Sequence, residues 1–134
     1  METALKIFAL IITAFLFGGM LLFTAGFAAF LFKVLPDNEA RSLIRKSFPY
    51  FYLFVISVSL LAAILTASSD LVSASALALI ALTTVPTRQI LMPAINAATD
   101  SGDWMRFVFL HGASVVITLL HIVVSAAVLV RYLG

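Results

Sequence analysis

The chain has 134 residues, of which 63% are hydrophobic and only 10% are charged, whereas a soluble domain carries roughly 25% charged residues. This composition excludes a soluble globular protein and a disordered chain, and a net charge of only +2 excludes a nucleic-acid-binding protein. No cysteine is present, which excludes disulfides, thiolate metal sites and cysteine nucleophiles.

Charged residues divide the chain into long apolar runs. The uncharged segments cover residues 7–32, 47–69, 71–87 and 107–130. A helix needs about 20 apolar residues to cross a bilayer core, and its backbone polar groups must be hydrogen-bonded inside the span. The sequence therefore predicts one all-α domain over residues 1–134, an integral membrane four-helix bundle with helices at about 5–33, 47–69, 71–95 and 104–131. The first run is too long for a signal peptide, so we expect that helix to be retained.

Small residues gather on the first helix, at Ala14, Gly18, Ala25 and Ala28. Small side chains let another backbone approach closely within a membrane. We therefore expect this face to contact a helix and not lipid, with a cavity or pathway beside the glycines as the alternative.

The first loop follows Pro36, which should end the first helix. Asp37 or Asn38 is a suitable N-cap for a short helix that could place Leu43 in the membrane interface and Arg41 near lipid phosphates. An ordinary solvated loop is the alternative. In the last connection, Asp103 is expected to cap the fourth helix.

Positive charge is unevenly distributed between the two sides of the membrane. One side holds Lys33, Arg41, Arg45, Lys46, Arg88 and Arg106, and the other holds only Lys6 and Arg131. Cytoplasmic loops are enriched in Lys and Arg. We therefore expect a multi-pass protein of the bacterial inner membrane with both termini outside the cytoplasm.

A polar group is expected at the cytoplasmic ends of the third and fourth helices, formed by Arg88, Asn96, Asp100 and His111. A buried Arg without a counter-charge is costly in a membrane, and Asp100 is the acid nearest to Arg88 along the chain. We expect a network that joins Arg88 to Asp100 or Asn96, with His111 at its edge; snorkelling of Arg88 to phosphate is the alternative. Asp70, in contrast, should be a solvated loop residue.

The fourth helix carries a polar stripe at alternating spacings of three and four, formed by His111, Ser114, Thr118, His121 and Ser125. This spacing places all five residues on one face of a helix, and lipid offers no partner for an imidazole. The stripe should therefore face the bundle interior. Interhelical hydrogen bonding is the simplest interpretation, and a functional role for one histidine is the alternative.

The sequence offers few metal ligands. The two histidines are ten residues apart, about 15 Å along a helix, so one metal cannot bind both. A weak alternative is a site that pairs His111 or His121 with Met20 or Met92, which would suit copper or haem. No cofactor is the leading expectation.

Several short motifs follow one another in a recognisable order. The first half contains Gly18-Gly19-Met20, Phe32-Lys33-Val34-Leu35-Pro36 and Phe48-Pro49-Tyr50, and the second contains Arg88, Pro93, Asn96, Asp100, Leu110-His111 and Ser114. In these motifs the chain resembles the small bacterial membrane proteins related to eukaryotic transmembrane protein 205. The resemblance implies four membrane helices and brings no established reaction.

No motif of a soluble enzyme occurs in the chain, and no enzymatic activity is expected. The leading hypothesis is a structural, binding or accessory subunit in the lipid bilayer, within a homo-oligomer or a larger membrane complex. A copper- or haem-handling membrane protein is the alternative, similar in kind to four-helix copper-resistance proteins. A small transporter that acts as an oligomer is the third.

Overall fold

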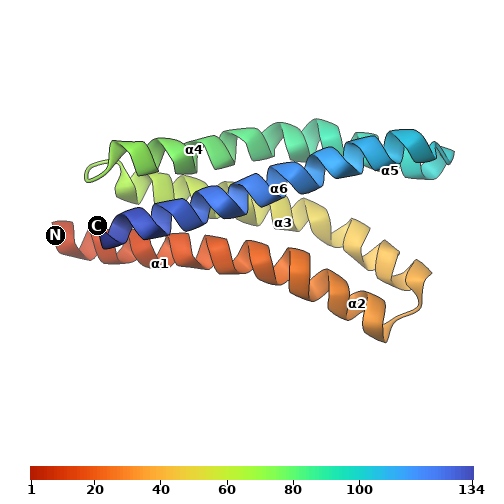
Figure 1. Ribbon diagram of the computed structural model, residues 1–134, viewed down its shortest axis with the longest axis horizontal. Coiled ribbons are helices and arrows are strands. Elements are labelled where there is room, and N and C mark those ends of the chain that lie inside the picture. Colours follow the sequence, from red (N-terminus) through yellow and green to blue (C-terminus); the bar gives the residue numbers. More distant parts are fainter.

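The computed structural model describes all 134 residues as four long helical segments without strands (Figure 1). The first segment comprises α1 (Glu2–Leu21), the π-helical turn η1 (Leu22–Phe27) and α2 (Ala28–Val34), and the second is α3 (Asp37–Thr66). The third segment comprises α4 (Leu71–Pro86), the π-helical turn η2 (Thr87–Leu91) and α5 (Met92–Ser101). The fourth segment is α6 (Trp104–Leu133). Each segment is long and apolar enough to cross a membrane. The predicted all-α four-helix membrane architecture is confirmed.

The segments pack as an up-and-down bundle in which α1 contacts α3 and α6, and α4 contacts the same two helices. Both termini and the turn at residues 67–70 lie at one end, here called the terminal end (Figure 1). The turns at residues 35–36 and 102–103 lie at the other end, here called the basic end because the half of the bundle toward it holds six of the eight Lys and Arg residues. Both termini therefore share one side of the membrane, as expected.

The helices extend further than hydropathy predicted. A helix of 30 residues, such as α3, is about 45 Å long, so it continues beyond a hydrocarbon core of about 30 Å. The expected short helix after Pro36 is not separate, because α3 runs without a break from Asp37 through Pro49. Acidic residues in its first turn favour this start by complementing the helix dipole.

The third segment also continues past its expected end at residue 95. Pro86 and Pro93 lack the N–H groups of a regular helix, and η2, with a bond from the Met92 N–H to the Thr87 carbonyl, lies between them. The segment ends at Gly102, whose φ of 71° is left-handed and favours glycine. Asp103 then caps α6 by accepting from the Arg106 N–H at 3.2 Å, which confirms the predicted cap.

The bundle interior is narrow, with 25 of the 134 residues buried. Its apolar centre includes Leu16, Met20, Val55, Leu77 and Ile80. Buried hydroxyl groups lie between these side chains and donate mostly to carbonyls of their own helix, as Thr84 does to the Ile80 carbonyl at 2.6 Å. Small hydroxyl residues at helix contacts are typical of membrane bundles, and the large exposed apolar side chains of all four segments suit a lipid environment.

Candidate functional site

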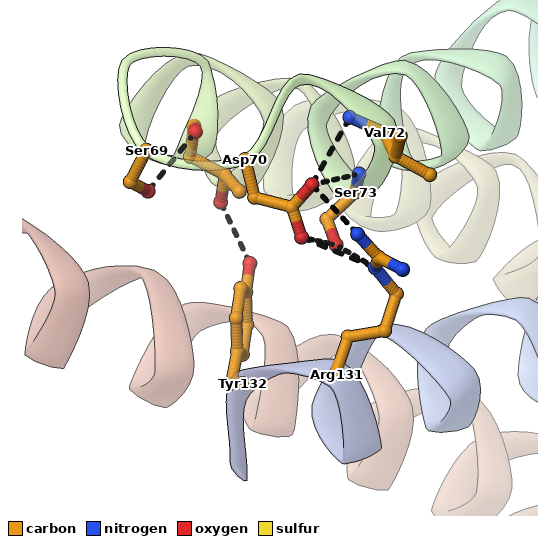
Figure 2. Close-up of polar contacts among 7 residues, drawn as sticks. Ser69, Asp70, Val72, Ser73, Arg131 and Tyr132 are labelled. Carbon is orange, nitrogen blue, oxygen red and sulfur yellow. Dashed lines mark hydrogen bonds and ion pairs between the residues drawn. The ribbon is translucent and has the colours of Figure 1, made fainter. Parts of the chain in front are cut away.

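The densest group of polar contacts lies at the terminal end and begins with Asp70, the N-cap of α4 (Figure 2). Its Oδ1 accepts from the backbone N–H groups of Val72 and Ser73, both at 3.1 Å. The Ser73 hydroxyl donates to Oδ2 at 2.5 Å. Asp70 thus satisfies backbone donors that the first turn of a helix leaves unpaired.

Arg131, near the C-terminal end of α6, holds the same carboxylate from the opposite side (Figure 2). Its Nε donates to Oδ2 of Asp70 and its Nη2 donates to Oδ1, both at 3.1 Å. These hydrogen bonds, followed by that from Ser73, hold the pKa of Asp70 well below its ordinary value of 3.8. The prediction that Asp70 is a solvated loop residue is therefore wrong, because the packing of α6 against α4 brings Arg131 onto it.

Tyr132 connects three helices beside this ion pair. The Thr66 hydroxyl donates to the Ala62 carbonyl at 2.7 Å, so its only proton is used and it must accept from the Tyr132 hydroxyl, 2.6 Å away. The Tyr132 oxygen is then free to accept from the hydroxyl of Thr13, at 3.3 Å. Figure 2 shows the ring pointing from α6 toward the end of α3. The hydroxyl therefore links α1, α3 and α6, a contact that the sequence analysis missed.

At the basic end, Asp100 pairs with an arginine other than the one expected. Arg45 of α3 donates through Nη1 and Nη2 to its two carboxylate oxygens, at 2.7 and 2.9 Å. Arg88 instead donates through Nε to the Pro49 carbonyl at 3.1 Å and through Nη1 to Gln89 at 2.9 Å. The predicted Arg88–Asp100 pair is wrong because the two residues lie on one continuous helical segment, 12 residues or about 18 Å apart.

The other two members of the expected polar group also lie apart from Arg88. Asn96 is half-buried and forms no hydrogen bond with Arg88. His111 is exposed and stacks on Phe107, with ring centroids 5.2 Å apart. The predicted network of Arg88, Asn96, Asp100 and His111 is therefore not formed.

The polar stripe of α6 faces the bundle only in part. Ser114, His121 and Ser125 are buried and Thr118 is half-buried, as predicted, but His111 is exposed because only α5 and η2 pack against the start of α6. Both serine hydroxyls donate to carbonyls of α6 itself, at 2.8 Å.

His121 forms the one interhelical hydrogen bond of the stripe. Its Nε2 lies 2.8 Å from the Thr83 hydroxyl. That hydroxyl donates to the Leu79 carbonyl at 2.7 Å, so the imidazole must be the donor to it. His121 therefore has its Nε2 proton committed to packing, as the simplest interpretation of the stripe predicted.

The weak metal candidates lie in different surroundings. Met20 is fully buried in the apolar centre, and Met92 is half-buried and packs against that centre. Nε2 of His121 is hydrogen-bonded to the Thr83 hydroxyl. No three His, Asp or Glu side chains form a group that could hold a metal ion. The weak site proposed for His111 or His121 with these methionines has no support from this geometry.

The small-residue face of the first segment is not covered by any helix of the chain. Ala14, Gly18 and Ala25 are exposed and Ala28 is half-buried, and a Cβ added to Gly18 would meet no atom within 4 Å. Within one chain, the expected helix contact at this face is absent. Gly19 is the position of close approach instead, since its Cβ would lie 2.5 Å from Cζ of Phe54.

Comparison with known proteins gives one match. The family model described as a domain of unknown function (DUF4149) matches residues 11–103. It extends from α1 to the α5–α6 turn and includes Asp70, Arg45 and Asp100 but not α6. No curated protein and no solved structure matches the chain.

Proposed function

We propose that this chain, which belongs to the family of the domain of unknown function DUF4149, is a non-catalytic structural or binding subunit of a membrane assembly. The order of its motifs further supports a relation to the transmembrane protein 205 family. The observation that carries the proposal is that the polar side chains inside the bundle are all hydrogen-bonded within the chain. Every buried side-chain nitrogen and oxygen has a hydrogen-bond partner within the chain, and the bonds of Tyr132 and His121 join neighbouring helices.

Two ion pairs at opposite ends support a rigid role. Asp70 and Arg131 connect α4 to α6 at the terminal end, and Arg45 and Asp100 connect α3 to α5 at the basic end. Paired two-point contacts between Arg and a carboxylate fix orientation as well as distance. A bundle whose helices are joined by an ion pair at each end suits a scaffold better than a transporter, which must open each end in turn.

The uncovered face of α1 supports a second copy of this chain as the partner. Gly18 and Ala14 lie between the larger side chains of Ile11 and Leu22, which are 54% and 71% exposed. In a two-fold dimer the same face meets itself, so the large side chains of one copy could fill the space above the small residues of the other. A small-residue contact allows close backbone approach, and the resulting van der Waals packing favours helix association in lipid.

The charge distribution supports the proposed location in the inner membrane with the basic end in the cytoplasm. Arg45 is the only one of the six positive residues at that end to form an ion pair. The others carry uncompensated positive charge, which favours retention on the cytoplasmic side.

The absence of native cysteine allows a direct test by cross-linking in membranes. Gly18→Cys should form a disulfide-linked dimer on oxidation. Gly112→Cys on α6 is the matched control, since a Cβ there also meets no atom within 4 Å, and it should remain monomeric. Equal cross-linking of both variants, or none of either, would contradict the dimer.

The other hypotheses have separate readouts. Copper or haem bound stoichiometrically to the purified protein, seen by metal analysis and absorption spectroscopy, would replace this proposal with the metal-handling alternative. Solute flux into vesicles that depends on the protein would replace it with the transporter.

A further inference from the structure

A groove of about 420 Å³ lies between the first segment and α3. Its walls are aromatic, with Phe15, Phe23 and Phe27 on one side and Tyr50, Phe51 and Phe54 on the other. The volume falls within the range of about 300–1,000 Å³ that is usual for small-ligand sites. The groove is open at the surface of a membrane-spanning bundle, so its first neighbours are lipid molecules.

The groove is elongated along the helix axes. Phe15, Gly19, Phe23 and Phe27 recur at every fourth position and cover about 18 Å of helix. Gly19 lets the Phe54 ring reach the backbone of α1. An open apolar groove of about 420 Å³ suits an alkyl chain better than a helix, which has a diameter of about 10 Å or more.

Ring contacts shape the walls of the groove. Phe23 stacks on Phe51 with centroids 4.3 Å apart, and Phe15 meets Phe54 edge-on at 5.1 Å. Within η1, Phe23 and Phe27 stack at 5.3 Å. Wide π turns are often found at functional sites, and this one keeps two rings on the same wall.

The end of the groove nearest the basic end is polar and positively charged. Ser47 and Tyr50 line it, and Lys46 lies one helical turn before Tyr50, on the same side of α3. Lys46 forms no ion pair, whereas the neighbouring Arg45 is neutralised by Asp100. Lys46 therefore carries a positive charge without an ion-pair partner, one helical turn from the Tyr50 side chain that lines the groove.

We propose that this groove binds one acyl chain of an anionic phospholipid and that Lys46 and Tyr50 contact its phosphate. The charge selects the lipid, because a zwitterionic lipid offers the same chain without a net negative headgroup. The proposal does not rest on the dimer, since the residues that line the groove belong to the first segment and α3 of a single chain.

Fluorescence quenching by brominated lipids tests the site in vesicles. The only native tryptophan is replaced by Trp104→Phe, and Phe27→Trp then reports from the groove, with Phe15→Trp as a second reporter if the first fails to fold. Phe109→Trp, at a residue of α6 that is 76% exposed, reports on ordinary lipid contact. Vesicles contain phosphatidylcholine and phosphatidylglycerol, with bromine on the acyl chains of only one of them.

The groove reporter should show about a fivefold preference for phosphatidylglycerol, the value expected for one lysine near a membrane surface. The Phe109→Trp reporter should show none. Lys46→Gln should abolish the preference, whereas Arg106→Gln, which removes a charge from the same end of the bundle, should leave it unchanged. Equal quenching of the groove reporter by both lipids would overturn the proposal, as would equal effects of the two charge substitutions.

Discussion

Gly19→Ala is the substitution whose effect follows most directly from the geometry of the bundle. The added Cβ would lie 2.5 Å from Cζ and 2.7 Å from Cε1 of Phe54. Both distances are far below ordinary van der Waals contact, so the Phe54 ring must turn away. Its edge-on contact with Phe15, at 5.1 Å, would be disturbed as well.

The neighbouring Gly18→Ala isolates the cost of this overlap. Both substitutions gain the helix preference of alanine over glycine, about 0.5–1 kcal/mol, and a Cβ at Gly18 meets nothing within 4 Å. The shared gain cancels in the comparison. Gly19→Ala should therefore be less stable than Gly18→Ala by about 1–3 kcal/mol, the usual cost of overpacking.

The free energy of unfolding in detergent micelles, measured by denaturant titration of the monomer, gives the comparison. Repeating both alanine substitutions in a Phe54→Ala background should remove the difference, because the overlapping ring is gone. A Gly19→Ala protein as stable as Gly18→Ala in the native background would refute the reasoning, as would a difference that persists without Phe54.

Four further predictions use the ends of the bundle. Asp70→Asn should lower the free energy of unfolding more than Asp100→Asn, because Asp70 both caps α4 and pairs with Arg131. The Asp100 side chain is 60% exposed and has a single partner. Unfolding titrations in which Asp100→Asn is the more destabilising substitution would contradict this. The pKa of Asp70 is held below its ordinary value of 3.8 by the hydrogen bond from Arg131, so its contribution is complete above that pH and is lost as the pH falls below it. Asp70→Asn should therefore reduce the acid sensitivity of unfolding measured between neutral and strongly acidic pH. Tyr132→Phe should lower the free energy of unfolding by about 1 kcal/mol through loss of the interhelical hydroxyl, and an unchanged value would argue against that link. A reporter enzyme fused after Gly134 should be active only outside the cytoplasm, and cytoplasmic activity would reverse the proposed orientation.

The four spans and the Asp103 cap could be predicted because they depend on local chemistry. A bilayer requires a long apolar helix whatever its neighbours are, and the side chain of an N-cap bonds to its own next turn. The true start of α3 could not be read from hydropathy, since a helix continues through the headgroup layer until a residue such as Pro36 interrupts it. Local chemistry likewise could not show that Asp70 has a distant partner in Arg131.

The sequence by itself determined which residues share an end of the bundle, and the tertiary structure alone decided which of them meet. Arg45 and Lys46 are adjacent on α3, yet only Arg45 pairs with Asp100. Gly18 and Gly19 are adjacent, yet only Gly19 faces another helix of the chain. Successive residues point about 100° apart around a helix, so partner choice depends on the rotation of each helix about its axis, and that rotation is set by the packing of all four helices together.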